Sequence, residues 1–436
     1  MDYVALAVPF FLLALFVELI YGWVIKNNTY RINDTISSLF MGSLRGTSKV
    51  LGIGFAWAVW SFVETHFALW SMDTSSVFTW VFSFVIYDLF YYLFHRYSHE
   101  RQIFWASHVA HHHSEEYNLS TALRQTGTGF FIKWVFYIPL FAIGMPSEVF
   151  LSVASINLIY QFWVHTQHIP KLGWYELFFV TPSNHRVHHS QNDLYIDRNY
   201  GGVFIIWDRI FGTFQEEQDS EPCVYGIRSS INTFNPIKAN LHIYSKILGE
   251  IKNAKSWKDK LYSPFARTGW EPGLPFGSTK TGSFDTQAFS KHDPEISIST
   301  KFYAFIQFLM VTVFALFFLD GGDLTYEQSI AALVLVIFTM FCITQWLDGF
   351  RILILEASRL LLVLSAGFLL LQQGEEFLSN LLFGYAFLNL LVLPFLPRSE
   401  KDGPKSSEFD GIIQEASIKN KGSVSYTHLR AHETSI

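Results

Sequence analysis

The apolar residues of this chain are grouped into blocks long enough to cross a membrane. A spanning helix needs about 20 mostly apolar residues. The first block, residues 4–24, has that length and carries neither a preceding Lys or Arg nor a small-residue cleavage site, so it indicates an anchor and not a signal peptide. We expect nine spans, at residues 4–24, 50–70, 77–94, 130–143, 149–164, 303–319, 330–346, 352–371 and 377–396.

The positive charges between these blocks lie on one side. Lys and Arg follow the first, third and fifth blocks, whereas residues 71–76, 144–148, 321–328 and 373–376 contain neither. Cytoplasmic loops carry the excess of Lys and Arg. The pattern therefore predicts an outside N-terminus and a cytoplasmic C-terminus, in the endoplasmic reticulum or a bacterial inner membrane.

The composition supports a membrane protein and excludes several other classes. Half of the 436 residues are hydrophobic and 16% are charged, against about 25% charged in a soluble domain. A net charge of -6 provides no cationic field for nucleic acid. Two cysteines, Cys223 and Cys342, cannot build a disulfide framework. We therefore expect an all-α integral membrane protein, a multi-span helical bundle.

The blocks divide the chain into four parts. Residues 1–230 form a first membrane module, 231–300 a cytoplasmic connector, 301–397 a four-helix membrane module and 398–436 a disordered tail. The last dozen residues match nothing upstream and resemble the translated read-through of a sequencing adapter, so they are excluded from fold reasoning.

Eleven of the sixteen histidines fall between His95 and His189, in short motifs. An HxxxH pair ends the third block, and two HxxHH motifs follow 77 residues apart. Residues four apart on a helix share one face. All the motifs emerge on the predicted cytoplasmic side, so the spans can bring them together. The motif residues are His95 and His99, His108, His111 and His112, His185, His188 and His189, with His165 and His168 at the end of the fifth block.

So many imidazoles on one membrane face predict a site for two metal ions. Imidazole binds Fe, Zn, Cu and Ni. A structural zinc takes four ligands and a catalytic zinc three plus water, so eight to ten histidines exceed the needs of one ion. Single histidines are most often plain surface residues, but three motifs within 95 residues make that interpretation a poor one.

These motifs and their neighbours resemble the fatty acid hydroxylase and sterol desaturase superfamily of membrane-bound di-iron oxygenases. The likeness covers residues 70–280 and includes Asp88, Tyr92, His95 and Arg96 in the spacing DxxxYxxHR, and the closing run at 199–214. Within the superfamily, EEYNLSTALRQ at 115–125 and TPSNHRVHHS at 181–190 are most similar to the alkylglycerol monooxygenases.

The resemblance implies a ligand set for two iron ions. Asn184 stands where the family often has another histidine, and His113 and His168 are additional ones, of which we interpret His113 as a bystander. The implied metal ligands are His95, His99, His108, His111, His112, His165, His185, His188 and His189, and residues 1–230 are then the di-iron oxygenase domain.

Two acids near the first motif are candidates for supporting roles. Asp88 lies seven residues before His95, on the same helical face, and we expect it to accept the second ring N–H of a ligand histidine. Glu100 either orients a histidine or pairs with Arg96 or Arg101.

Other polar residues are candidates for lipid contacts or packing. Tyr117, Asn118 and Arg124 follow the second motif, and we expect them to form a polar mouth that binds a lipid headgroup. Glu356 and Arg359 are three apart in the eighth block and are expected to neutralise each other, as a structural pair or along a lipid path.

The resemblance implies a monooxygenase that acts on a lipid with dioxygen and an electron donor. In the alkylglycerol monooxygenases the carbon next to the ether oxygen is hydroxylated, a fatty aldehyde is released, and tetrahydrobiopterin supplies the electrons. No pterin, flavin, haem or NAD motif is visible in the sequence. Two alternatives remain open: a sterol, fatty acyl or carotenoid hydroxylase or desaturase, and a metal-binding transporter, whose ligands would lie near mid-membrane.

Overall fold

The computed structural model describes residues 3–44, 53–280, 282–315 and 325–396. Within these ranges the chain consists of helices, short 3-10 turns and loops, with three isolated β-bridges but no strand. The expected all-helical fold is confirmed. The tail from residue 398, including its last dozen residues, lies outside the described residues.

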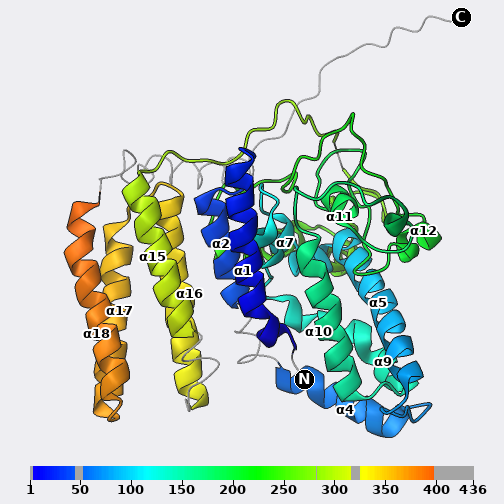
Figure 1. Ribbon diagram of the computed structural model, residues 1–436, viewed down its shortest axis with the longest axis horizontal. Helices are drawn as coiled ribbons and strands as arrows, with labels where there is room; N and C mark the ends of the chain where they lie inside the picture. Colours follow the sequence, from blue (N-terminus) through cyan, green and yellow to red (C-terminus); the bar gives the residue numbers. More distant parts are fainter. Residues whose placement is uncertain (1–2, 45–52, 281, 316–324, 397–436) are drawn as a thin grey trace, which may run out of the picture.

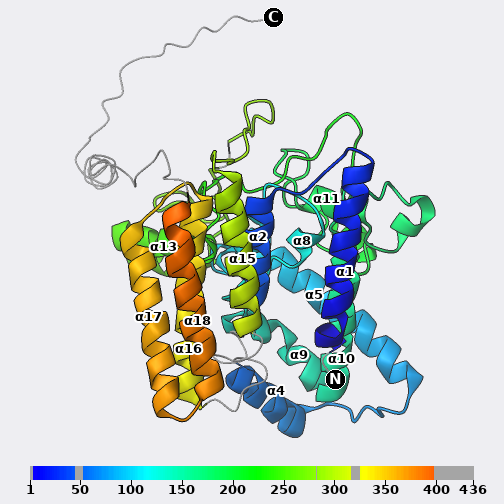
Figure 2. The same cartoon turned by 60° about the vertical axis from the view of Figure 1, so that its left-hand side comes forward.

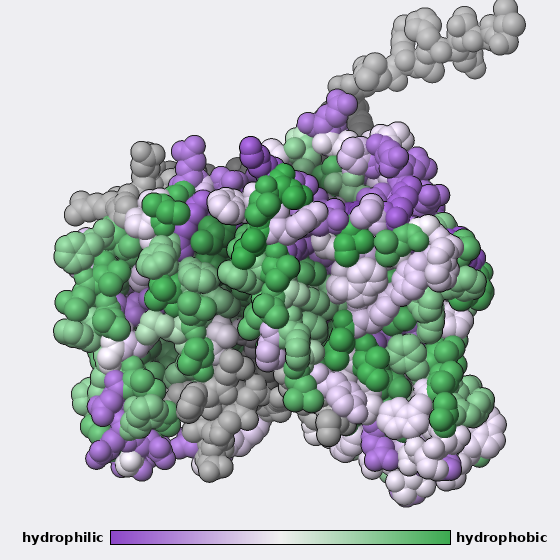
Figure 3. All heavy atoms as spheres, viewed as in Figure 1, coloured by the Kyte–Doolittle hydropathy of each residue, from purple (hydrophilic) through white to green (hydrophobic). Residues whose placement is uncertain are grey.

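Six helices of the described chain are long and apolar enough to cross a membrane, and Figure 1 shows them standing roughly parallel. Their middle section is covered by hydrophobic side chains, while hydrophilic residues gather at the upper end (Figure 3). The protein is therefore a multi-pass membrane protein. The six helices are α1 (Tyr3–Val24), α5 (Val77–Glu100), α15 (Ile298–Ala315), α16 (Tyr326–Leu347), α17 (Leu353–Gln372) and α18 (Glu376–Val392), which η6 (Leu393–Phe395) extends.

The other three expected spans are not single helices of 18 or more residues in the described parts of the chain. Helix α4 (Ile53–Phe67) has 15 residues and α10 (Ser147–Trp163) has 17, somewhat fewer than the about 20 of a typical span. Residues 130–143 break into η1 (Gly129–Phe131), η2 (Lys133–Tyr137) and α9 (Ile138–Ile143).

Helix α2 (Ile32–Leu44) joins the two halves of the bundle. Its Ile36 and Phe40 are buried with Phe308 of α15 and with Met340 and Ile343 of α16. Figures 1 and 2 show α15–α18 on one side of α2 and the remaining membrane helices on the other. The C-terminal module is thus packed directly against the first membrane module.

The predicted pair in the C-terminal module is confirmed. Arg359 Nη2 lies 2.6 Å from the Glu356 carboxylate, and both side chains are buried. Trp346 Nε1 donates to Glu356 at 2.7 Å, and Arg359 donates to Tyr303 and Asn389. A buried charge needs such partners in a membrane.

Short helices and loops close the upper end of the bundle, where the histidines lie. They are α6 (Gln102–Ala106), α7 (Val109–His112), α8 (Leu119–Ala122), η3 (Gly173–Leu177), α11 (Pro182–His188), α12 (Ile206–Phe211), α13 (Pro236–Asn253) and α14 (Trp257–Tyr262), followed by η4 (Ser263–Phe265).

Candidate metal centre

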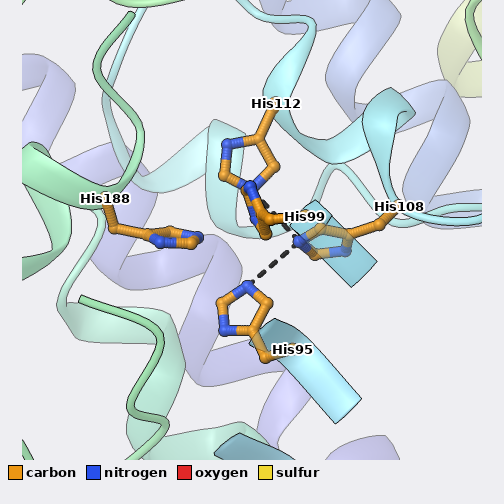
Figure 4. A group of neighbouring side chains, drawn as sticks. All are labelled: His95, His99, His108, His112 and His188. Atoms are coloured by element: carbon orange, nitrogen blue, oxygen red, sulfur yellow. Dashed lines mark hydrogen bonds between the residues drawn. The ribbon is translucent and has the colours of Figure 1, made fainter. Parts of the chain in front are cut away.

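The nine histidines singled out in the sequence meet in two adjacent groups. Each histidine of a group offers one ring nitrogen, and these nitrogens all lie within 4.8 Å of one another. Figure 4 shows the five rings of the first group pointing toward a common centre. The first group is His95, His99, His108, His112 and His188, and the second group is His111, His165, His185 and His189.

The HxxHH spacing explains how two short helices serve both groups. In each motif the first and third histidines are one turn apart and belong to the same group, while the middle histidine points about 100° away and belongs to the other. The groups share a wall, because the rings of His112 and His189 stack with centroids 4.2 Å apart. The motifs therefore lie close enough for one two-metal site.

The two additional histidines stay outside both groups. The Nδ1 atom of His113 lies 3.0 Å from the Arg124 guanidinium, which donates to it. His168 packs edge-on against Tyr21, with centroids 5.3 Å apart. The interpretation of His113 as a bystander agrees with this placement.

Backbone carbonyls fix the tautomer of four histidines. A carbonyl oxygen only accepts hydrogen bonds, so each of these Nδ1 atoms carries the proton and each Nε2 atom keeps a free lone pair. Such contacts orient metal-binding imidazoles. The pairs are His95 with Tyr200 at 2.8 Å, His111 with Arg124 at 2.8 Å, His165 with Gln161 at 2.8 Å and His188 with Arg198 at 2.9 Å.

The resulting arrangement of ring nitrogens suits metal cations. The Nε2 atoms of His111 and His165 lie 3.4 Å apart, and both present lone pairs. Burial lowers the pKa of His111 to about 4 and that of His165 well below its usual value, so protons do not bridge them near neutral pH. The Nε2 atoms of His99 and His188 are buried without a hydrogen-bond partner. Metal ions would satisfy these atoms, so the two groups fit a two-metal centre.

Comparison with known proteins agrees with this geometry. The family model for fatty acid hydroxylase matches residues 80–213, a range that contains all nine histidines. The chain is 37% identical over 354 residues to alkylglycerol monooxygenase of Homo sapiens, covering 80% of this chain and 78% of the relative. The chain belongs to the fatty acid hydroxylase family.

Other relatives give the same assignment. Alkylglycerol monooxygenases of Danio rerio and Caenorhabditis elegans are 37% and 33% identical, covering 71% and 73% of this chain and 69% and 67% of the relatives. None of the solved structures compared with the chain matches it. The family resemblance inferred from the motifs is confirmed.

One loop of the chain supplies both carbonyls that orient histidines of the first group. Arg198 and Tyr200 flank Asn199, whose φ of 56° is left-handed, a region that Asn tolerates better than most residues. The Asn199 side chain donates to the Asn184 carbonyl at 3.0 Å and accepts from Gln215 N at 2.8 Å. The first of these bonds connects the loop to α11, and the second connects it to the segment after α12.

Asp208, at the first turn of α12, holds the same loop. Its buried carboxylate accepts from the backbone N–H groups of Tyr200 and Gly201, both at 2.7 Å, and from the Thr213 hydroxyl at 2.6 Å. Sequence reasoning placed Asp208 in the family's closing run without a role. The sequence signal for this role was an acidic residue among large apolar residues, because a buried acid needs hydrogen-bond partners.

Asp88 supports this loop as well, so the expected contact with a histidine ring is wrong. It accepts from Val203 N at 2.9 Å, Phe204 N at 3.0 Å and Trp207 Nε1 at 3.0 Å. That face of α5 lies against the loop after Tyr200, two turns away from the histidines. Glu100 accepts from Arg96 at 2.8 Å, which was one of its two predicted alternatives.

The expected polar mouth is also wrong, because its three residues are at most 1% exposed. Arg124 donates to the Ala110 carbonyl at 2.8 Å and to the Ser38 hydroxyl at 3.1 Å. Asn118 caps α8 and donates to the Thr29 carbonyl at 2.7 Å. The Tyr117 hydroxyl donates to the Val164 carbonyl at 2.9 Å, while its ring stacks on His165. All three side chains therefore stabilise the segments around the centre through buried hydrogen bonds.

Glu18 is a further residue that sequence reasoning missed. This acid of α1 is buried, accepts from Leu119 N at 2.8 Å, and accepts from the hydroxyls of Tyr30 and Thr166. It thereby ties the first membrane helix to the residue that follows His165. A single acid late in an apolar block was the signal, since intramembrane acids have partners.

Proposed function

We propose that this protein is a monooxygenase that hydroxylates the carbon next to the ether oxygen of alkylglycerol lipids. The observation that carries the proposal is the 37% identity to alkylglycerol monooxygenase over 80% of the chain. The two histidine groups supply the centre that such a reaction needs. A relative named for a sterol, lathosterol oxidase of Homo sapiens, matches only 42% of this chain at 26% identity, which favours the ether lipid.

Two iron ions are the metals that we assign to this centre, one per histidine group. Nitrogen-only ligands suit iron as well as zinc, but zinc has no redox chemistry. Bound iron would supply the activation of dioxygen that oxidation of an unactivated C–H bond requires. We propose tetrahydrobiopterin as the electron donor, on the strength of the family likeness.

The protein's own residues would orient the ligands and exclude water. The nine rings are mostly buried, and four are fixed by carbonyls, so the centre is preorganised. It lies where α5 and α10 end. That position lets an alkyl chain stay between the membrane helices while the glycerol part remains at the surface.

The overall reaction balances with one reductant. One atom of dioxygen enters the C–H bond, and the other leaves as water with two electrons and two protons from the donor. The product is a hemiacetal, whose C–O bond breaks to release a fatty aldehyde and a glycerol. This collapse needs only a proton transfer to the departing oxygen.

The membrane orientation follows from the charged loops. We propose that the N-terminus is outside and that the histidines and the C-terminus are cytoplasmic. The alkylglycerol monooxygenases that the chain matches are animal proteins, which favours the endoplasmic reticulum. Residues 1–230 would form the catalytic domain, 231–300 the connector and 301–397 the second membrane module.

An aldehyde assay tests the proposal. The iron-loaded protein in lipid nanodiscs, given a 1-O-alkylglycerol lipid, oxygen and tetrahydrobiopterin, should release a fatty aldehyde that mass spectrometry detects. The His188→Ala protein should lose this activity, and the matched His168→Ala protein should keep it, because His168 lies outside both groups. Hydroxylation of a sterol or an acyl chain without aldehyde release would contradict the proposal and would indicate a hydroxylase with another lipid substrate.

A further inference from the structure

We propose that α13 and α14 form an in-plane membrane anchor that inserts into the headgroup layer on the histidine side and binds anionic phospholipid. The surface consists of five exposed apolar residues and six lysines, which we call the α13–α14 surface. Its members are Leu241, Leu248, Trp257, Leu261 and Phe265, with Lys238, Lys246, Lys252, Lys255, Lys258 and Lys260.

The two ends of this segment lie at the ends of spanning helices. Before α13, the backbone N–H of Phe234 donates at 2.7 Å to the carboxylate of Asp348, the residue that ends α16. After α14, Thr268 N donates to the carbonyl of Glu100, the last residue of α5, at 3.3 Å. Figure 2 shows α13 at the height of the upper ends of α16–α18. The segment therefore runs along the membrane boundary.

One face of α13 is buried, and its exposed side carries two leucines beside lysines. Ile243 and Ile247 pack in a cluster with Ala106 and Val109 of α6 and α7. On the other side Leu241 and Leu248, two turns apart, are 45% and 66% exposed. Lys238, Ser245 and Lys252 are exposed on the same side, so the helix presents apolar and basic residues together, as interfacial helices do.

The segment that follows continues this apolar surface. Trp257, Leu261 and Phe265 are spaced by four residues and are 78%, 72% and 60% exposed. Trp is favoured at the membrane interface, where its ring lies at headgroup level. An amphipathic helix with Trp, Phe and Leu on one face and Lys around it typically lies in the interface plane.

The charge of the segment matches an anionic lipid surface. Residues 236–265 contain six lysines against two acids, in a chain whose net charge is -6. One acid, Glu250, is bound by the Gln102 amide and the Ser263 hydroxyl as well as by Lys246. The other, Asp259, lies in the first turn of α14. Basic clusters beside membrane helices attract anionic headgroups.

Lipid contact here would act on the metal centre. Helix α13 packs on α6 and α7, and the segment from α6 to α7 carries His108 and His112. The same leaflet would then hold both the lipid substrate and the helix that supports two histidines of the first group.

Spin labelling tests the placement. The full chain with Cys223 and Cys342 replaced by Ser would carry one label at a time, in nanodiscs of phosphatidylcholine and phosphatidylserine. Labels at Leu248→Cys and Leu261→Cys should be severalfold more accessible to oxygen, relative to a water-soluble nickel complex, than the matched label at Ser290→Cys, an exposed connector position. Equal accessibility at the three positions would overturn the proposal and would favour a soluble partner for this surface.

A second measurement tests the lysines. Replacing Lys252, Lys255, Lys258 and Lys260 by Gln should reduce the phosphatidylserine that co-purifies with the protein severalfold relative to phosphatidylcholine. The control replaces the exposed Lys171 and Lys280, which form surface ion pairs elsewhere. An unchanged ratio of the two lipids in the quadruple variant would show that the surface does not select anionic lipid.

Discussion

We predict that Asp208→Asn weakens one of the two metal sites and spares the other. Asp208 accepts hydrogen bonds from Tyr200 N and Gly201 N with its two carboxylate oxygens. An Asn side chain has one oxygen, so its amide NH₂ must face one of these N–H groups. The loop that orients His95 and His188 through its carbonyls then loses a fixed position.

The expected loss of metal affinity can be estimated from the hydrogen bonds that Asp208→Asn removes. A hydrogen bond to a charged group contributes about 1.5–3 kcal/mol, and one of the two backbone bonds is replaced by a repulsive contact. Loss of an outer-shell partner typically weakens metal affinity about 10–100-fold, which corresponds to about 1.4–2.7 kcal/mol. The two values agree. The second group should change little, because His111 and His165 are oriented by other carbonyls.

Stepwise metal titration against a competing chelator is the assay. The wild-type protein should show two affinities, and the variant should keep one and lose about 10–100-fold in the other. Asp193→Asn is the matched control, since Asp193 is 52% exposed and pairs with Arg228. Unchanged affinities at both sites would refute the role of Asp208, and an equal loss at both would show that the variant disturbs the whole centre and not this loop.

Four further outcomes are expected. Arg124→Lys should lower the thermal unfolding midpoint without raising KM for the lipid, because Arg124 is buried; a raised KM with unchanged stability would restore the headgroup role. Glu356→Gln should destabilise the protein by about 3–5 kcal/mol, measured by chemical unfolding, because Arg359 would lose its buried partner; the metal content should not change. Burial raises the pKa of the Cys223 thiol to about 12, so its alkylation by a maleimide at pH 8 should be slow and should accelerate as the pH rises toward 12, whereas rapid alkylation at pH 8 would contradict this. Deletion of residues 425–436 should leave expression and iron content unchanged, and a loss of iron would show that this segment takes part.

The sequence was most informative where residues of one chemical type recurred at the spacing of a helical turn. The i, i+4 spacing of His108 and His112 and of His185 and His189 requires only a turn of helix to bring the rings together, and the structure shows both turns. Long apolar blocks such as residues 352–371, where the structure has α17, likewise needed no tertiary information to be identified as helices.

The sequence was least informative where a side chain's partner came from a distant segment. Asp88 shares a helical face with His95, but its partners are Asn157 and the loop after Tyr200, which lie 69 or more residues away. Arg124 has the chemistry of a headgroup ligand, yet its donors are taken by Ala110 and Ser38. Local spacing does not specify which loop packs on a helix.

The number of iron ions per chain tests the central claim most directly. Metal and protein should be quantified together on the purified, iron-loaded chain, for the wild type and for a protein in which His111 and His165 of the second group are replaced by Ala. We expect a ratio of two for the wild type and one for the variant, because the five histidines of the first group remain. A wild-type ratio of one or zero, or a variant that still holds two ions, would contradict it.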